Sequence, residues 1–390
     1  MFLYRLTAAI VKFLLKILLG YKLNIDETVQ DWKKEKRPFV ILSAHPSELD
    51  ATILMTAAFP NKARFVTGAQ QLYKGLQGKI LRLLKIIPKR QFMADITAVK
   101  EMMKAVKDGY ILGMMPEGRL SLDGTDNPID ISTAKLIKKL GVPVAFLIPR
   151  GTFWIKPSYY WSTLILPGKI SADMFCLFTE EDLKNLSNEE VLAKLNEACT
   201  YNESELLRGS GKTFGRKNKP YMEKCSNLFY RCARCGEFYT MSDDGRKLTC
   251  SACGLEMTIT REMFFENEDK SLPDNVAAWN KMQLEYEKQF WSNPDAELVW
   301  TVFKDMLIFK KETEFTRIAQ GELRLSHKGL YYKDETEELI VPMANFLGVA
   351  ADYKLSRVSY YQGDEIRRFE FIDRHCAAQF VNALMTLKNN

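Results

Sequence analysis

A histidine and an aspartate five positions apart form the first pair in this sequence that could carry out acid–base chemistry. His45 and Asp50 lie in the segment SAHPSELD, which follows the apolar run PFVILSA. If a helix began at Pro46, a favourable first-turn residue, the carboxylate would come round beneath the imidazole. It would hold one ring N–H and leave the other ring nitrogen free to accept a proton, as a general base requires. Taken alone, such a pair occurs often by chance, so a structural histidine beside a solvated acid is the preferred interpretation.

A second element carries groups that suit a phosphate. After the apolar run 110–115 the chain reads Pro-Glu-Gly-Arg at positions 116–119. Gly118 allows the backbone to approach a ligand closely, and the guanidinium of Arg119 can hold two phosphate oxygens at once. By itself, this segment is equally consistent with an ordinary surface turn.

A basic segment, residues 74–90, lies between these two elements. It contains six Lys and Arg residues and no Asp or Glu, and its apolar residues alternate with the cations in an amphipathic pattern. Such a segment suits a membrane surface that is rich in phosphate. The alternative is a solvated helix that covers the core.

Together, and in this order, the three elements resemble the glycerophospholipid acyltransferase family, the lysophosphatidate acyltransferases and their relatives. The apolar run VPVAFLIP at 142–149 matches the fourth block of that family. Many members have Asn where this chain has Ala44, and many read Glu-Gly-Thr-Arg where it reads Glu-Gly-Arg. The resemblance implies that His45 and Asp50 form the catalytic pair. It also implies a set of residues that bind the phosphate of the acyl acceptor: Arg90, Glu117, Gly118 and Arg119.

The resemblance also implies a reaction. A fatty acyl group passes from a thioester, acyl-coenzyme A (acyl-CoA) or acyl carrier protein (acyl-ACP), to the free hydroxyl of lysophosphatidate, which gives phosphatidate. No catalytic cofactor is expected. Two alternatives stay open: an acyltransferase for another lysophospholipid or a glycolipid, and a non-catalytic adaptor that binds membranes and partners.

Four cysteines have the spacing of a metal site. They follow the pattern Cys232-x2-Cys235-x14-Cys250-x2-Cys253, and each pair is followed by a glycine. A tetrahedral zinc ion held by four thiolates has no open position, so we expect a structural zinc ribbon. Iron in a rubredoxin-like site is the alternative. Because 225–262 has no dense basic run, nucleic acid is not expected as a partner, whereas a protein partner of the ribbon or of the C-terminal module is left open.

The first 20 residues combine apolar character with three cations. At 100° per residue, Arg5, Lys12 and Lys16 fall within about 40° of one another on a helix. A spanning helix would bury these charges, whereas a helix in the headgroup plane keeps them in water. We therefore predict an amphipathic membrane-surface helix and a peripheral (monotopic) protein on the cytoplasmic face of a bacterial membrane. The alternative is a helix that docks on its own domain with a basic outer stripe.

Composition and charge agree with a folded, cytosolic protein that meets anions. The 390 residues are 46% apolar and 27% charged. Residues 1–100 hold 17 Lys and Arg against 7 Asp and Glu, a balance of +10, which leaves −4 for the rest of the net +6. Eight cysteines in a chain of this length do not suggest a disulfide scaffold, and they indicate a reducing compartment.

Periodicity predicts the elements that position these residues. Apolar runs alternate with amphipathic stretches from Pro38, which indicates an α/β fold with a mixed, largely parallel sheet; we expect helices near 99–106 and 132–140. From 296 the alternation is that of antiparallel strands, with a helix over 374–388. The predicted organisation is a membrane-surface helix (1–20), an α/β acyltransferase domain (21–222), a zinc ribbon (223–262), a helical connector (263–295) and an antiparallel β domain with a C-terminal helix that resembles pleckstrin-homology (PH) or GRAM modules (296–390).

Overall fold

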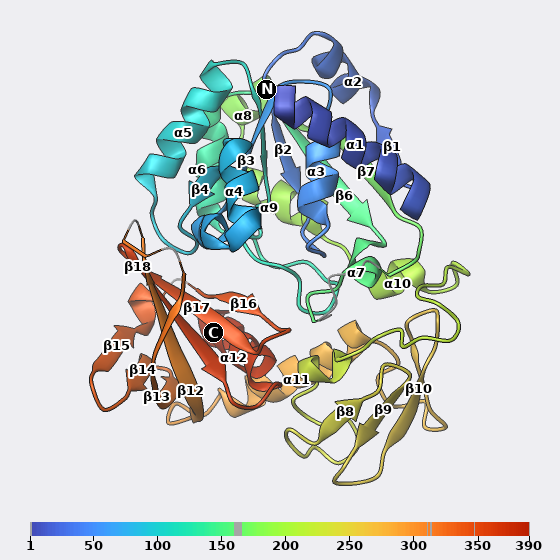
Figure 1. The fold of residues 1–390 in the computed structure, drawn as a ribbon, viewed down its shortest axis with the longest axis vertical. Helices are drawn as coiled ribbons and strands as arrows, with labels where there is room; N and C mark the ends of the chain where they lie inside the picture. Colours follow the sequence, from blue (N-terminus) through green and yellow to red (C-terminus); the bar gives the residue numbers. More distant parts are fainter. Residues whose placement is uncertain (1, 160–165, 310, 313, 347, 390) are drawn as a thin grey trace. The chain divides into compact units, whose positions relative to one another are not determined.

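The computed structural model of the protein describes residues 2–159, 166–309, 311–312, 314–346 and 348–389. The chain forms two compact units (Figure 1). The first contains most of the residues up to Phe214, and the second contains most of those from Gly215 onward.

The first unit is built on a seven-stranded sheet with the order β1-β7-β6-β2-β5-β3-β4. All neighbouring strands pair in parallel except β6 and β7, so the predicted mixed, largely parallel sheet is confirmed. The carboxyl ends of β6, β2, β5, β3 and β4 therefore lie at one edge, where α/β proteins bind ligands. The strands are β1 (Lys22–Ile25), β2 (Val40–Ser43), β3 (Ala63–Gly68), β4 (Ile87–Lys89), β5 (Ile111–Met114), β6 (Val144–Arg150) and β7 (Ser171–Phe178).

Helices cover the two faces of this sheet. On one face, Val40 and Leu42 of β2 share a core with α5, α6 and α9; on the other, α3 packs on the central strands and α1 lies across α3 (Figure 1). The predicted helix ending at Gly141 is present, and that glycine adopts φ +65°. The helices are α1 (Phe2–Leu19), α2 (Glu27–Lys34), α3 (Asp50–Ala58), α4 (Gly75–Leu83), α5 (Ile96–Lys107), α6 (Ile131–Leu140), α7 (Thr152–Ile155), α8 (Glu180–Asn185), α9 (Asn188–Cys199) and α10 (Glu203–Leu207).

The two segments predicted to suit a membrane surface, residues 1–20 and 74–90, differ in secondary structure. Residues 2–19 form one continuous helix, α1, whereas residues 74–90 divide into the helix α4 and the short strand β4. Within the described part of the chain, no helix has the length and apolar character needed to cross a membrane.

The second unit contains two antiparallel sheets. The cysteine-bearing segment forms a small sheet with the order β11-β10-β9-β8, in which β8 (Met241–Asp243) and β9 (Lys247–Cys250) make a hairpin around Gly245. The remaining strands of this small sheet are β10 (Glu256–Ile259) and β11 (Phe265–Glu266), and the helix α11 (Val276–Phe290) follows them.

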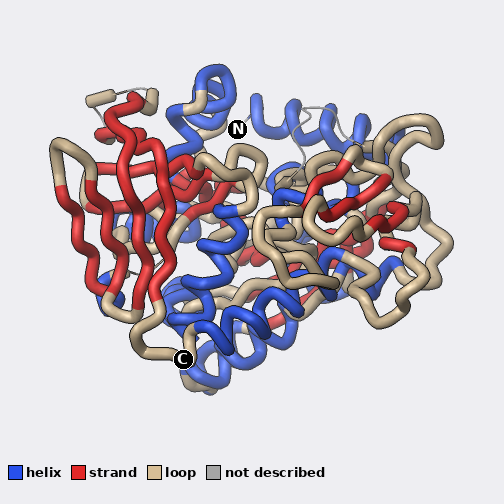
Figure 2. Tube along the Cα trace, turned by 90° about the horizontal axis from the view of Figure 1, so that it is seen from below, coloured by secondary structure: helices blue, strands red, loops and turns tan. Residues whose placement is uncertain are grey.

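The C-terminal sheet has the order β15-β14-β13-β12-β18-β17-β16, and its long strands run side by side in Figure 2. Its strands are β12 (Glu297–Ile308), β13 (Thr316–Ser326), β14 (Gly329–Lys333), β15 (Glu338–Pro342), β16 (Ala350–Asp352), β17 (Arg357–Gln362) and β18 (Glu365–Phe371). The long strand β12 pairs with β13, and the register of this pairing shifts between Lys304 and Asp305.

The last helix, α12 (Cys376–Asn389), lies where a helix was predicted over 374–388, and it buries Ala378, Val381, Leu384 and Leu387. The antiparallel sheet and this helix match the predicted outline. Identity with a PH or GRAM module stays a prediction.

Candidate active site and metal centre

His45 and Asp50 lie at the carboxyl end of the central strand β2. The helix α3 begins at Asp50 and not at Pro46 as predicted, because residues 46–49 form a separate turn. The carboxylate nevertheless reaches the imidazole, with 3.4 Å between His45 Nδ1 and Asp50 Oδ2. Asp50 is completely buried, and 18% of the His45 side chain is exposed. A proton on Nδ1 facing this carboxylate leaves Nε2 as the proton acceptor.

Three donors hold the buried carboxylate of Asp50. Besides the His45 ring, the backbone N–H of Ser47 donates to Oδ2 at 2.5 Å and the hydroxyl of Thr152 donates to Oδ1 at 2.7 Å. Burial raises the pKa of Asp50 above its usual value, and the bonds to His45, Thr152 and Ser47 act in the opposite direction. Sequence reasoning missed Thr152, which lies just beyond the fourth apolar block.

Glu117 and Ser121 hold both backbone groups of His45. The N–H of His45 donates to Glu117 Oε1 at 2.8 Å, and its carbonyl accepts the N–H of Ser121 at 3.0 Å. The other oxygen of Glu117 accepts the backbone and side-chain N–H groups of Asn127, at 2.8 and 3.0 Å. Glu117 is buried, which raises its pKa against the lowering effect of the Asn127 bonds. These contacts fix the backbone at His45, and a role of Glu117 in acceptor binding stays a prediction.

The other predicted acceptor-binding residues follow β4 and β5, at the same edge of the sheet. Gly118 has φ +69°, the left-handed conformation that favours glycine, and Arg119 beside it is half-buried. Arg90 follows β4 and pairs with Asp95, whose Oδ2 accepts the Arg90 N–H at 2.9 Å and lies 3.5 Å from Nε. Asp95 also caps the N-terminus of α5, so the helix start fixes the position of the Arg90 backbone.

A third buried acid, Glu203 at the start of α10, was also missed. Its Oε2 accepts the N–H of Gly151, the residue before Thr152, at 2.8 Å. Its Oε1 is buried and accepts no hydrogen bond from the described residues. Burial, with a further contribution from the negative charge of Asp50, raises the pKa of Glu203 to about 8 although the Gly151 bond acts to lower it. No local sequence signal identifies this residue.

Part of this chain matches a known protein family. Residues 23–147, which carry His45, Asp50, Arg90 and the Pro-Glu-Gly-Arg turn, match the family model described as Acyltransferase. Residues 23–147 form an acyltransferase-family domain. A solved structure with some likeness is that of PlsC, the 1-acyl-sn-glycerophosphate (LPA) acyltransferase of Thermotoga maritima; it is 21% identical with a TM-score of 0.42, and the match covers 53% of this chain and 80% of that chain. No curated protein matches the chain.

The four cysteines of the ribbon meet at one point. Their Sγ atoms all lie within 4.8 Å of one another, and the pairs Cys232–Cys253 and Cys235–Cys250 are 3.9 Å apart. Sulfurs bound at about 2.3 Å around a tetrahedral ion are about 3.8 Å apart, whereas a disulfide requires about 2.05 Å. The cluster therefore fits a metal ion held by four thiolates and does not fit disulfides.

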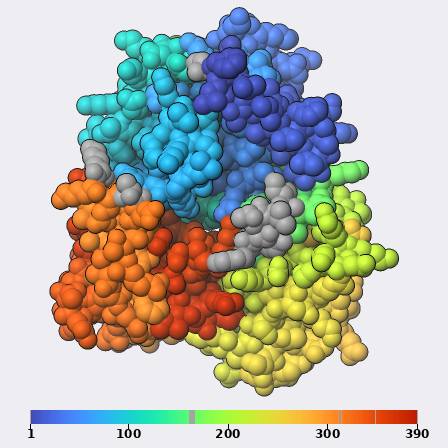
Figure 3. Space-filling model, viewed as in Figure 1, coloured from blue at the N-terminus to red at the C-terminus, as the bar shows by residue number. Residues whose placement is uncertain are grey.

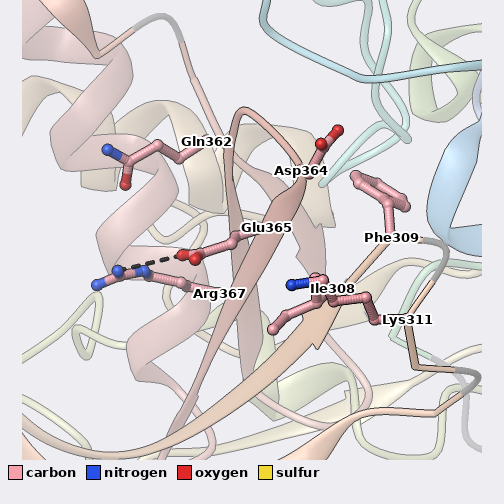
Figure 4. A pocket seen from close by; sticks show the side chains of 7 residues that line it. All are labelled: Ile308, Phe309, Lys311, Gln362, Asp364, Glu365 and Arg367. Atoms are coloured by element: carbon pink, nitrogen blue, oxygen red, sulfur yellow. Dashed lines mark hydrogen bonds and ion pairs between the residues drawn. The ribbon is translucent and has the colours of Figure 1, made fainter.

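The C-terminal sheet contains a hollow whose lining charges do not indicate a particular kind of ligand. The hollow has a volume of about 450 Å³. Figure 4 shows its lining residues, among them Lys311, Asp364, Glu365 and Arg367. Arg367 pairs with Glu365 at 3.3 Å. Two cations and two carboxylates balance, so the charge of the hollow favours neither an anion nor a cation.

The cysteine geometry predicts one bound metal ion per chain. We expect Cys250→Ser to abolish this metal and to expose the ribbon to protease, because a structural four-thiolate site supplies folding energy. Elemental mass spectrometry and limited proteolysis measure both effects. Cys225→Ala, a buried cysteine outside the cluster, is the matched control and should retain the metal. Full metal content in Cys250→Ser would contradict the assignment.

The environment of Glu203 predicts a dependence of stability on pH. Its usual pKa is 4.5, and the folded value is about 8. Between these values the folded chain binds more protons than the unfolded chain, so the free energy of unfolding falls as the pH rises through this window. Urea unfolding at pH 5 to 8.5 should show a smaller decline for Glu203→Gln. Glu205→Gln, an exposed neighbour, should behave like wild type, and identical profiles for wild type and Glu203→Gln would reject the prediction.

Proposed function

We propose that this protein transfers a fatty acyl group from an acyl thioester to the free hydroxyl of a lysophospholipid, with lysophosphatidate as the acceptor and phosphatidate as the product. The observation that carries the proposal is the His45–Asp50 pair at the carboxyl edge of the sheet, inside an acyltransferase-family segment. Nε2 of His45 takes the hydroxyl proton as the oxygen attacks the thioester carbonyl. The new ester forms, the C–S bond breaks, and His45 returns the proton to the leaving sulfur.

Asp50 stabilises the imidazolium during this step, and its burial strengthens the interaction because water does not screen it. A thioester is already activated and the base acts on the nucleophile of the substrate, so the step requires neither a covalent enzyme intermediate nor a metal. Acyl-CoA and acyl-ACP both satisfy this chemistry as donors.

The acceptor phosphate is assigned to Arg90 and Arg119, with Gly118 allowing close approach of the backbone. These residues follow β4 and β5, whose carboxyl ends lie at the same edge as that of β2. A bound phosphate would orient the hydroxyl toward His45, and such positioning supplies much of the rate enhancement in a reaction between two substrates.

Membrane association is proposed from the outward face of α1. This helix buries Tyr4, Ala8, Leu15 and Leu19, and the opposite side exposes large apolar residues. The exposed set is Phe2, Leu6, Ile10, Phe13 and Ile17. Helical periodicity places Arg5, Lys12 and Lys16 on the stripe between the two apolar sides. A helix that only docks on its own domain needs no apolar outer face.

The basic helix α4 supports the same proposal. It exposes Leu76, Ile80 and Leu83, and its segment reaches the surface on the same face of the molecule as α1 in Figure 3. Exposed apolar side chains beside lysines and arginines suit the headgroup region of an anionic bilayer, where the acceptor and the acyl tails reside. We therefore propose a peripheral protein at the cytoplasmic face of a membrane.

The metal of the cysteine cluster is proposed to be zinc in a structural role. Four thiolates leave no open coordination position, so the ion would hold the ribbon together and take no part in acyl transfer.

Substitution of His45 tests the reaction. We expect His45→Ala to lower the rate of acyl transfer by about 10²- to 10⁴-fold, because the proton acceptor is lost. Radiolabelled acyl-CoA and acyl-ACP, offered with lysophosphatidate and with headgroup-bearing lysophospholipids in vesicles, identify the donor and the acceptor. His327→Ala is the matched control. If wild type acylates none of these acceptors and His45→Ala behaves like wild type, the result would favour the non-catalytic adaptor.

Substitutions in α1 test the membrane proposal. We expect Phe13→Ser combined with Ile17→Ser to weaken binding to anionic vesicles by about tenfold or more, because two side chains that are each 62% exposed would lose their burial in lipid. Vesicle co-sedimentation measures the change. Ile372→Ser, an exposed apolar residue of the C-terminal unit, is the control, and equal binding of all three proteins would rule out α1 as the anchor.

A further inference from the structure

The chain that leaves β6 makes hydrogen bonds to Ser47 and Asp50, beside the His45–Asp50 pair. We call residues 151–156 the α7 strap. Gly151 begins it with φ +78°, and a Cβ at this position would come within 2.9 Å of the carbonyl oxygen of Lys169. All four residues of α7 are buried, and Thr152 is completely so.

Both ends of the α7 strap contact the turn that joins β2 to α3. At one end, Thr152 Oγ1 donates to Asp50 Oδ1 at 2.7 Å. At the other end, Ser47 Oγ donates to the carbonyl of Lys156 at 2.8 Å. Ser47 also donates its backbone N–H to the second carboxylate oxygen of Asp50. The strap and the turn therefore hold the carboxylate from both sides.

We propose that Thr152 is a positioning residue, whose hydroxyl fixes the carboxylate of Asp50 so that Oδ2 stays aimed at His45 Nδ1. Its role rests on the proposed function, in which His45 becomes charged during turnover. Oδ2 is shared between the Ser47 N–H and the imidazole, and Oδ1 has the Thr152 hydroxyl as its partner. Without that hydroxyl, a fully buried oxygen loses its bond, and the carboxylate gains freedom to turn away from the ring.

The α7 strap has anchors that do not involve this hydroxyl. Gly151 donates its N–H to Glu203 Oε2 at 2.8 Å, and the indole N–H of Trp154 faces the Glu203 carbonyl at 3.4 Å. Valine has nearly the shape of threonine, so Thr152→Val removes the bond to Asp50 and leaves these anchors in place. The substitution therefore separates the position of the carboxylate from the fold of the strap.

The first arm of the experiment is kinetic. We expect Thr152→Val to lower kcat by about 10- to 100-fold with little change in KM, and Thr152→Ser, which keeps the hydroxyl, to restore most of the activity. Thr56→Val is the matched control. Thr56 lies on α3 and, like Thr152, has a buried hydroxyl, but this hydroxyl donates to the Ile53 carbonyl and not to Asp50. This variant should retain the wild-type kcat. Wild-type kcat in Thr152→Val would overturn the proposal.

The second arm is a double-mutant cycle with Asp50→Asn. If Thr152 acts through the carboxylate, Thr152→Val should cost less than about threefold in kcat once the carboxylate is absent. An equal loss in both backgrounds would mean that the substitution harms the site by another route, and would reject the proposal.

The third arm does not depend on turnover. The chain has three histidines, so the ¹⁵N signals of its imidazoles are few, and His45→Ala identifies the signal of His45. We expect the tautomer with a proton on Nδ1 in wild type and in Thr152→Ser, and a mixture of tautomers in Thr152→Val. If wild type transfers no acyl group, the proposed reaction is rejected, and a loss of this tautomer preference in Thr152→Val would still support the positioning role. An unchanged tautomer in Thr152→Val would reject the positioning role.

Discussion

The candidate active site depends on one carboxylate, that of Asp50, which is held in a fixed orientation and kept out of water. Asp50 is completely buried, and burial acts against its ionised form. A donor to each oxygen favours the ionised form, and the fold draws these donors from the turn at Ser47, from α7 at Thr152 and from the His45 ring. A buried carboxylate with fewer partners would take up a proton, and it would no longer stabilise an imidazolium.

The residues that hold His45 and Asp50 in place follow three neighbouring strands. β2 supplies His45, β5 leads to Glu117, which binds the His45 backbone, and β6 leads to Thr152, which binds Asp50. In the order β6-β2-β5 these strands are adjacent and parallel, so their carboxyl ends meet without long loops. Arg90 and Arg119, the two arginines proposed to bind the acceptor, follow β4 and β5 at the same edge.

The local part of this site was predictable from the sequence, and the distant part was not. The spacing of His45 and Asp50 brings the two side chains together even though α3 starts later than expected, because the carboxylate folds back on the Ser47 N–H. Thr152 lies 102 residues from Asp50, and only the strand order makes them neighbours. The helices were predicted with similar limits: α12 agrees with the expected range 374–388, whereas α5 begins at Ile96, before the expected 99, and buries Ala98 outside that range.

Asp50 of the pair and two further acids, Glu117 and Glu203, are buried in this part of the fold, and their charges cannot all be present at low cost. Asp50, Glu117 and Glu203 are each at least 97% buried, and each has a raised pKa. Glu203, with a pKa of about 8, is mostly protonated at neutral pH, so it binds the Gly151 N–H without adding a second full charge near Asp50. Protonation of Glu203 removes a negative charge that would oppose the ionisation of Asp50. It also reduces the repulsion that an acceptor phosphate would meet at this edge of the sheet.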